Sequence, residues 1–492
     1  MPLRLYNTLT RKLEPFEPMA PPKVGVYACG ITAYDLSHLG HARALVTYDL
    51  VVRYLKHLGY QVTFVRNFTD IDDKIIARAN EKGEDPKALA ERFIGEFHTD
   101  TAKLNLLRPD HEPRATEVMD AIIELTQRLI SRGMAYAADG DVFFAVESFK
   151  TYGKLSGKAL EDLVAGARVD VNRVKRNPLD FNLWKASKPG EPSWDSPWGR
   201  GRPGWHIECS AMSMGILGET FDIHMGGLDL IFPHHENEIA QSEGCTGKPF
   251  ARYWIHNGFV NINQEKMSKS LGNFFTLRDL LGKYPGEVLR AYILGTHHTK
   301  PLDYSDDELK QAESGLKKLY ETLAHCQELL KRRCPDDPRA VPTPQEQKLL
   351  DQIAALPGQI SEFMDDDFNA AGSLGAVQGA RRAVNEYLLA HDFRATPVSC
   401  RIAEGLLAVV PLVRDILGIL YQEPKAFLDD LGSRVQAASG ITEPEILALI
   451  GERKAARAAK NFARADEIRK ELDAKGVEIK DSPQGTTWNW RR

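Results

Sequence analysis

The first seventy residues alternate a buried strand, an amphipathic helix and a second buried strand, and this pattern restricts the fold most. Residues 23–31 read KVGVYACGI and residues 61–68 read QVTFVRNF, two apolar runs typical of buried strands. Between them, apolar residues recur at helical spacing after His41, and the pattern ends at Gly59, a suitable helix C-cap. A helical crossover between two strands predicts a right-handed βαβ unit with parallel strands.

The same pattern returns in the second part of the chain. TFDIHMGG at 220–227 predicts a strand, PHHENEIAQSEGC at 233–245 a helix, and RYWIHNGFV at 252–260 another strand. Two such halves predict a doubly wound parallel α/β domain with a Rossmann-like fold. In such sheets, ligands bind beyond the carboxyl ends of the strands.

The remaining residues predict an insertion and two further units, because 492 residues are too many for one core. A Pro-, Gly- and Trp-rich run at 185–205 is expected to be a loop, and SDDE at 305–308 predicts a capping box that begins a long helix. The predicted organisation is a first half of the Rossmann-like catalytic domain at 1–73, an inserted mixed domain at 74–203, the second half at 204–300, a helical bundle at 301–421 and a small α+β domain at 422–492.

Composition argues against a membrane protein and against a disulfide scaffold. The most apolar stretch, 406–420, is interrupted by Arg414 and Asp415, and the N-terminus has no signal-peptide core, so a cytoplasmic protein without a membrane span is expected. Six widely spaced cysteines without a CxxC pair predict reduced thiols. The net charge is −5, but residues 451–492 carry eleven Lys and Arg against seven Asp and Glu, so any nucleic-acid surface must be local.

Two short motifs contain residues suited to binding phosphate. HLGH at 38–41 places two histidines around a glycine at the turn from strand to helix, where backbone N–H groups and the helix dipole favour anions. KMSKS at 266–270 places two lysines three residues apart beside small residues. Each motif alone also fits an ordinary structural role, a helix start or a solvated loop. Together they indicate ATP chemistry more specifically.

These paired motifs resemble the signatures of the class I aminoacyl-tRNA synthetases, which activate an amino acid with ATP and transfer it to tRNA. The resemblance implies that ATP binding and transition-state stabilisation fall to His38, Gly40, His41, Lys266 and Lys269. The segment GGLDLIFPHHENE at 226–238 also fits the family and implies a ribose contact by Asp229. Magnesium is expected to enter with ATP, without a dedicated protein cage.

Four dispersed residues have side chains that suit a zinc ion. Two thiolates, one imidazole and one carboxylate would complete a tetrahedral site formed by Cys29, Cys209, His234 and Glu238. Spacing alone leaves alternatives open, because His235 or Glu236 could replace a neighbour and the cysteines could be small buried apolar residues. The position of Cys29 at the carboxyl end of a predicted strand favours the ligand interpretation.

Over nearly its whole length the sequence resembles the cysteinyl-tRNA synthetases. The matching stretches are YACGITAYDLSHLGHAR, NFTDIDDKI, PGWHIECSAM, IHMGGLDLIFPHHENEIAQSE, KMSKSLGN, DDFN and KNFARADEIRKEL. The resemblance implies that one zinc ion per chain binds the substrate thiolate. It also implies a substrate pocket that includes Gly30, Thr69, Trp205 and His224. The expected partners are L-cysteine, ATP and a cysteine-specific tRNA, and the chain is expected to be a cytoplasmic monomer.

Zinc would help such an enzyme to distinguish cysteine from serine. Cysteine and serine differ by one atom, and ordinary pocket contacts separate such close analogues by only about 1–3 kcal/mol. A soft metal prefers a thiolate strongly over an alcohol that stays protonated at neutral pH. Selection by zinc would make a separate editing domain unnecessary.

Other polar clusters have simpler interpretations. Asp70, Asp72 and Asp73 fit a cap-and-turn cluster better than a magnesium site. Five histidines are expected to be structural or at the surface: His98, His111, His256, His297 and His298. The C-terminal TTWNWRR, with Trp488, Trp490, Arg491 and Arg492, fits either stacking on unpaired bases or packing on its own domain.

Two rival functions are compatible with part of this sequence. A cysteine ligase that joins cysteine to an amino sugar resembles the same catalytic core, but it has no need of the long basic region after Tyr421. A non-catalytic RNA-binding or zinc-sensing relative would have no reason to keep both histidines and both lysines of the two motifs.

Overall fold

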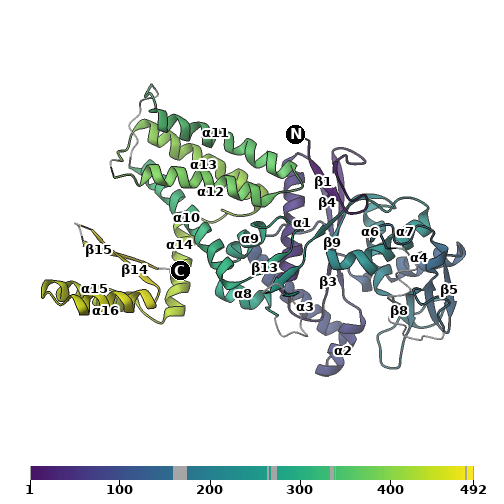
Figure 1. Ribbon diagram of the computed structural model, residues 1–492. Helices are drawn as coiled ribbons and strands as arrows, with labels where there is room; N and C mark the ends of the chain where they lie inside the picture. The colour runs from purple at the N-terminus through teal and green to yellow at the C-terminus, as the bar shows by residue number, and fades with distance from the viewer. Residues whose placement is uncertain are drawn as a thin grey trace.

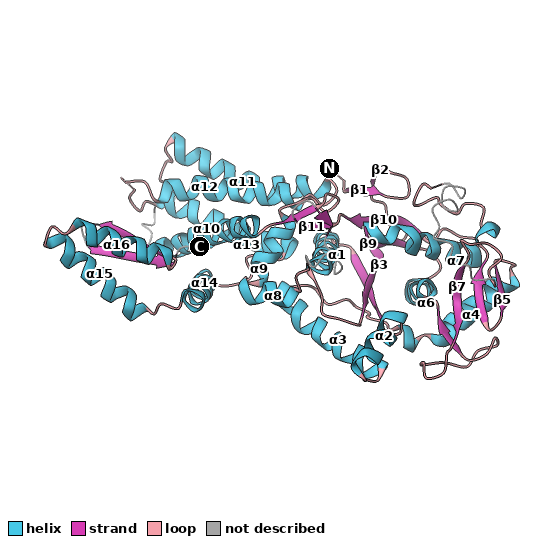
Figure 2. Ribbon diagram, turned by 60° about the horizontal axis from the view of Figure 1, so that its bottom comes forward, coloured by secondary structure: helices cyan, strands magenta, loops and turns pink. Residues whose placement is uncertain are grey.

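The computed structural model describes residues 2–158, 174–262, 265–266, 274–332, 337, 339–391, 393–482 and 485–490. Its parts follow one another along an elongated molecule, with the parallel sheet in the middle (Figures 1 and 2). The insertion that contains β5 and β8 lies on one side of the sheet. The helical bundle lies on the other side, and the C-terminal unit with α15 and α16 lies beyond the bundle.

The central sheet has four parallel strands in the order β10-β9-β3-β4. Helix α1 crosses from β3 to β4, and η5 with α7 crosses from β9 to β10, so the doubly wound Rossmann-like fold predicted from the two repeated patterns is confirmed. These elements are β3 (Lys23–Thr32), α1 (Leu39–His57), β4 (Gln61–Thr69), β9 (Phe221–Gly227), η4 (Leu228–Leu230), η5 (Ile231–His235), α7 (Glu236–Thr246) and β10 (Ala251–Asn257).

An N-terminal hairpin and the insertion surround this sheet. The hairpin pairs β1 (Arg4–Asn7) with β2 (Lys12–Pro15). Residues after β4 form α2 (Asp73–Lys82), α3 (Pro86–Thr101), η1 (Ala102–Leu104), η2 (Ala115–Glu117) and α4 (Met119–Ser131). An antiparallel sheet then joins β5 (Ala135–Ala138), β6 (Asp141–Phe144), β7 (Phe181–Ala186) and β8 (Gly201–Pro203), with η3 (Val146–Ser148) between β6 and β7 and α6 (Trp205–Leu217) after β8.

The expectation of a plain loop at 185–205 is wrong at both ends. The run begins inside β7, and Gly201–Pro203 pairs with β7 as the edge strand β8. Proline ends this strand, as is usual at a sheet edge, because it cannot donate a ladder hydrogen bond. Gly201 is required there, because an added Cβ would meet Lys185 O at 2.3 Å. The composition that suggested a loop therefore reflects close backbone packing.

Helices dominate the chain after β10. A small sheet of β11 (Val260–Ile262), β12 (Glu265–Lys266) and β13 (Leu302–Tyr304) is accompanied by α8 (Leu277–Lys283) and α9 (Gly286–Leu294). The bundle consists of α10 (Asp306–Lys331), α11 (Pro344–Asp365), α12 (Ala370–Leu388) and α13 (Pro397–Leu417). Ser305 caps α10 by accepting a hydrogen bond from the Glu308 N–H, which is one half of the predicted capping box.

The C-terminal unit combines helices with a hairpin. It contains α14 (Pro424–Ser439), α15 (Glu443–Ala458), α16 (Phe462–Ala474), β14 (Val477–Ser482) and β15 (Gly485–Trp490). Trp488 packs against a small core of its own domain, which includes Ile446 and Ile468. Of the two interpretations of the C-terminal tail, the structure shows packing on its own domain for Trp488. The side chain of Trp490 and both residues 491–492 lie outside the described part of the chain.

The cysteines outside the site differ from expectation at one position. Cys245 and Cys326 are buried free thiols, as predicted. Cys400 is disulfide-bonded, so the prediction of reduced thiols is wrong for this residue. Within the described residues, no helix has the length and apolar character that crossing a membrane requires.

Helix α1 joins the parallel sheet to the bundle, and both share one hydrophobic core. The buried Tyr54 near the end of α1 donates a hydrogen bond to Asp365 Oδ1 at 2.7 Å, at the end of α11. The guanidinium of Arg290, also buried, forms an ion pair with Asp49 of α1 and donates to the Leu417 carbonyl at 2.6 Å. Polar contacts in a dry interface thus fix α1 against two bundle helices.

Replacing Tyr54 by phenylalanine should lower the free energy of unfolding by about 1.5–3 kcal/mol, because a buried carboxylate loses a hydrogen-bond donor. Urea unfolding followed by tryptophan fluorescence measures the change. Tyr6→Phe is the control, since Tyr6 is 38% exposed and should change stability by less than about 0.5 kcal/mol. Equal midpoints for the two variants would show that the bond to Asp365 contributes nothing.

Candidate active site

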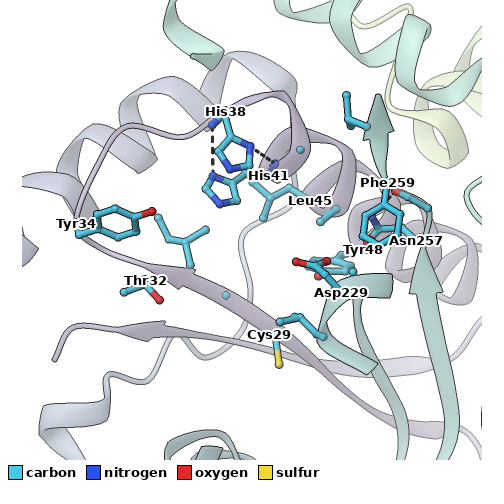
Figure 3. A pocket seen from close by; sticks show the side chains of 18 of the residues that line it. Cys29, Thr32, Tyr34, His38, His41, Leu45, Tyr48, Asp229, Asn257 and Phe259 are labelled. Atoms are coloured by element: carbon cyan, nitrogen blue, oxygen red, sulfur yellow. Dashed lines mark hydrogen bonds between the residues drawn. The ribbon is translucent and has the colours of Figure 1, made fainter. Parts of the chain in front are cut away.

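A cavity of 370 Å³ opens at the carboxyl ends of the parallel strands. Its lining includes several residues singled out in the sequence, namely Cys29, Gly30, His38, Gly40, His41, Trp205 and Asp229. Figure 3 shows the histidine pair at one end and Cys29 at the other, with Asp229 between them at the side. The cavity therefore lies where the doubly wound fold predicts a ligand.

The two histidines of HLGH cap helix α1 reciprocally. His38 is the N-cap residue; its Nδ1 accepts from the His41 N–H, and His41 Nδ1 accepts from the His38 N–H, both at 3.3 Å. Their rings stack with centroids 3.6 Å apart. Because Nδ1 accepts in both rings, the proton of each neutral imidazole is on Nε2. The capping role and a phosphate-binding role use different ring atoms, so the two interpretations are compatible.

Two glycines allow the chain to pass closely around the cavity. A Cβ on Gly30 would lie 1.6 Å from the Asn67 carbonyl oxygen, so the β-bulge between β3 and β4 requires glycine. A Cβ on Gly227 would lie 2.5 Å from Asp229 Oδ1. Glycine at this position therefore leaves room for the Asp229 carboxylate at the end of β9.

The predicted metal-ligating side chains meet in the buried interior below the cavity. The ligand atoms of Cys29, Cys209, His234 and Glu238 all lie within 4.8 Å of one another. His234 Nε2 is 3.0 Å from Glu238 Oε1, and Cys29 Sγ is 3.6 Å from the same oxygen. Strand β3, helix α6 and the η5–α7 segment each supply a part, which explains why the residues are far apart in sequence.

A second group of potential metal ligands overlaps the first and includes His235, the alternative ligand considered from the sequence. Cys29, His224, His235 and Glu238 also lie within 4.8 Å of one another. His235 Nε2 is 3.3 Å from Cys29 Sγ, and its Nδ1 is 2.8 Å from His256 Nε2. Glu236 is a weaker alternative, because its carboxylate accepts hydrogen bonds from the backbone of Gly153 and Ser156.

Electrostatics make this cluster a strong site for a cation. Although burial disfavours its charged form, His224 and His234 lower the pKa of Glu238 to about 2. A hydrogen bond from Cys29 lowers the pKa of Cys209 to about 6, whereas burial raises the pKa of Cys29. Against the effect of burial, Glu238 and Cys209 raise the pKa of His234 to about 10. The Glu238 carboxylate and the Cys209 thiolate are therefore negatively charged in a buried site, where they stabilise the positive charge of His234.

The remaining predicted pocket residues surround the metal-ligating cluster. The indole of Trp205 lies 4.2 Å from the His234 ring, between centroids. His224 Nε2 is 2.8 Å from Glu238 Oε2, beneath the cluster. Thr69 donates a hydrogen bond to the buried Glu208 at 3.1 Å. Thr69 and His224 are thus buried supports of the site and are not among the residues that line the cavity.

The KMSKS motif falls at the edge of the described residues. The backbone of Lys266 belongs to β12, whereas Lys269 lies outside the described residues. The chain after the motif adjoins the histidine pair: the ring of Phe274 meets His38 edge-on at 5.2 Å, and the Leu277 N–H donates to the Ser37 carbonyl at 2.7 Å. The chain that follows the motif, from Phe274 on, therefore lies beside the start of α1.

Sequence reasoning missed several residues of the site. Tyr34, Tyr48 and Asn257 line the cavity, and His206 Nδ1 contacts His234 Nδ1 at 2.9 Å. His206 follows Trp205 within the WHIECSAM stretch, so the motif itself was a signal that could have identified it. Tyr48 offered no signal beyond its place on the apolar face of α1.

The aspartate cluster at 70–73 is structural, as predicted. Asp72 is the N-cap of α2 and accepts from the Lys74 N–H. Asp70 accepts from the Thr116 N–H at 3.0 Å, and Asp73 pairs with Lys185 and Arg202. Each carboxylate thus has a protein partner, although Asp72 alone of the three has the predicted capping role.

A doubly wound parallel sheet with the HLGH histidines at the start of α1, followed by a helical bundle, is the fold of a class I aminoacyl-tRNA synthetase. A family model described as the tRNA synthetases class I (C) catalytic domain matches residues 15–314, and one described as the cysteinyl-tRNA ligase anticodon binding domain matches residues 442–488. The chain belongs to the cysteine–tRNA ligase family.

Curated relatives support this membership over the whole chain. The chain is 53% identical to a cysteine–tRNA ligase of Geobacter metallireducens and 54% identical to that of Geobacter sulfurreducens, with 99% of both chains covered in each case. It is also 52% identical to the ligase of Pelobacter propionicus, with complete coverage of both chains. Among solved structures, Mycobacterium tuberculosis methionyl-tRNA synthetase with methionyl-adenylate shares the fold, with a TM-score of 0.62, 17% identity, and 83% of this chain and 94% of the other covered.

Proposed function

We propose that this chain joins L-cysteine to the 3′ end of a cysteine-specific tRNA, using ATP and a cysteinyl-adenylate intermediate. One observation carries the proposal: a single cavity has the HLGH histidines at one end and Cys29 of the metal-ligating cluster at the other. An amino acid held by its thiol near Cys29 would direct its carboxylate toward ATP bound at the start of α1. The 53–54% identity to cysteine–tRNA ligases supports the same activity.

The residues present fit a zinc ion at the metal-ligating cluster. The proposed ligands are Cys29, Cys209, His234 and Glu238, which supply sulfur, nitrogen and oxygen donors in a buried group. His206 contacts the Nδ1 of His234 and would orient that ring, which is a common support for a metal-bound imidazole. When bound, zinc would supply a soft Lewis acid that prefers the substrate thiolate over the hydroxyl of serine.

In the first step, a carboxylate oxygen of cysteine attacks the α-phosphorus of ATP. The bond to the bridging oxygen breaks, pyrophosphate leaves with its electron pair, and cysteinyl-adenylate remains. His38 and His41 would donate from Nε2 to phosphate oxygens, and Lys266 and Lys269 would neutralise charge that builds up on the leaving group. Asp229 would hold the ribose and Gly30 would let the amino acid lie against β3. Magnesium would accompany ATP as part of the substrate.

In the second step, a terminal ribose hydroxyl of tRNA attacks the activated carbonyl and AMP leaves. No protein nucleophile is needed, because the adenylate is already reactive, so the protein contributes positioning and charge stabilisation. Trp205 would hold the cysteinyl group during this transfer, and Thr69 and His224 would support the site from beneath.

The proposal extends to the domains predicted from the sequence. Residues 1–73 and 204–300 would form the catalytic domain, 74–203 its insertion, and 301–421 and 422–492 the regions that contact tRNA. The match of residues 442–488 to an anticodon binding domain supports the last assignment. Arg491 and Arg492, which follow β15 in the sequence, would add positive charge for the tRNA backbone. We also propose a monomer that acts in the cytoplasm.

Charging of total tRNA tests the function. With ATP, magnesium and zinc, labelled cysteine should appear on tRNA, and labelled serine should not under identical conditions. Selection by the thiol predicts a preference for cysteine above the roughly 200-fold that ordinary contacts provide. Charging with both amino acids would contradict the metal-based selectivity. Cysteine-dependent pyrophosphate exchange without charging would favour a small-molecule ligase. The absence of both reactions would favour a non-catalytic protein.

A further inference from the structure

A second cluster of potential metal ligands lies where the catalytic part meets the bundle. His297 and His298 follow α9, and Asp367 lies in the short connection between α11 and α12. Their ligand atoms lie within 4.8 Å of one another. None of these residues lines the active-site cavity or belongs to the cluster around Cys29.

His298 is the most telling member of this cluster. The residue is only 4% exposed, and neither ring nitrogen has a hydrogen-bond partner among the described residues. Buried polar atoms are nearly always satisfied, and an unsatisfied one costs about 1–3 kcal/mol. The nearest carboxylate oxygen, Asp367 Oδ2, is 3.9 Å from His298 Nε2, too far for a hydrogen bond.

The other two residues converge on the same point. His297 Nε2 is 3.8 Å from Asp367 Oδ2, while His297 Nδ1 is held by Thr299 Oγ1 at 2.9 Å. Two ligands of one ion, each about 2.0–2.2 Å from it, stand at most about 4.4 Å apart. Separations of 3.8 and 3.9 Å therefore allow Asp367 to share one ion with either histidine, and the ligand atoms of all three residues lie within 4.8 Å of one another.

The surrounding backbone holds Asp367 in place. Asp367 and Phe368 both have positive φ angles, 55° and 54°, which are unusual for residues other than glycine. Asp367 Oδ1 accepts from the Tyr6 N–H at 2.7 Å, which leaves Oδ2 on the side of the histidines. Strained backbone that aims a buried carboxylate at two imidazoles is typical of a functional site.

Arg43 lies near the two histidines, and its guanidinium is occupied by backbone carbonyls, including those of Thr296 and His297.

We propose that His297, His298 and Asp367 form a second site for a divalent transition-metal ion of the zinc class, which ties the catalytic part to the bundle. Water would complete the coordination, because the side chain of His297 is 22% exposed. The site has nitrogen and oxygen ligands only, so it is chemically distinct from the thiolate site around Cys29.

Cobalt titration of the full-length, metal-free chain distinguishes the two sites. The wild type should bind two equivalents of Co²⁺, of which one gives a thiolate-to-cobalt charge-transfer band. His298→Asn and Asp367→Asn should each keep that band and lose one equivalent. Cys29→Ser, which changes a residue of both candidate sets at the active site, should strongly weaken the band and keep the equivalent that lacks it.

An exposed histidine and a folding check complete the design. His325→Asn should retain both equivalents, because His325 is an exposed residue of α10. If His298→Asn fails to give a native circular dichroism spectrum, Cys29→Ser and Asp367→Asn still decide the question. A single equivalent in the wild type, or two equivalents in folded Asp367→Asn, would overturn the second site. The charge-transfer band reports separately on the active-site metal, so failure of this inference does not affect the proposed function.

Discussion

Cys209→Ser should strongly weaken the thiolate-dependent metal site and cysteine activation together. Serine remains protonated and binds zinc poorly, so the remaining thiolate, imidazole and carboxylate would hold the ion weakly. We expect kcat/KM for cysteine-dependent pyrophosphate exchange to fall by more than about 100-fold, the upper end for residues that only orient a zinc ligand. In cobalt-substituted protein, the charge-transfer band should weaken in parallel.

Cys326→Ser provides a matched control for this variant. Cys326 is also a buried free thiol, but it lies in α10, within the core shared by the sheet and the bundle. It should keep both the charge-transfer band and the exchange activity. If Cys209→Ser kept metal and activity as well, Cys209 would be removed from the ligand set.

Lys269→Ala should slow adenylate formation by about 10²–10³-fold, the usual cost of removing one group that stabilises developing charge. The metal content should not change, because the proposed ligands are Cys29, Cys209, His234 and Glu238. Single-turnover formation of cysteinyl-adenylate, measured with saturating ATP, separates this loss from weaker ATP binding. The result would place the second lysine of KMSKS at the phosphates.

Lys310→Ala serves as the comparison, since Lys310 is exposed on α10 and makes only a long contact with Asp307, at 3.6 Å. Its adenylate formation should match the wild type. An unchanged rate in Lys269→Ala would mean that the histidine pair and Mg²⁺–ATP suffice for the first step.

Local sequence patterns predicted the parallel sheet well, because buried strands and a capped amphipathic helix are specified within short windows. The same reasoning failed at 185–205, where Gly201 and Pro203 belong to an edge strand. Their composition is the same in a loop and in a tightly packed sheet edge, and only the pairing with β7 separates the two. Tertiary pairing of this kind is not encoded in a local window.

The parts of the candidate site that contain rare residue types in distinctive patterns could be predicted from the sequence. The parts that contain common residues without a local pattern could not. Cysteines and paired histidines near strand ends drew attention to the cavity before its geometry was known. His298 was expected to be structural or at the surface, since nothing nearby in the sequence reveals that Asp367, some seventy positions later, faces it. His298 and Asp367 are too far apart in the sequence for a spacing pattern to connect them.

Helix α1 connects the histidine pair to the bundle as one continuous helix. Its 19 residues span about 28 Å, with the stacked histidines at one tip and Tyr54, bonded to Asp365 of α11, near the other. A tilt of about 5° about the bundle end would displace the opposite tip by about 2 Å, comparable to the length of the hydrogen bonds that phosphate recognition requires. The position of the histidine pair thus depends on how tightly the bundle holds the other part of α1, through Tyr54 and through the ion pair of Asp49 with Arg290.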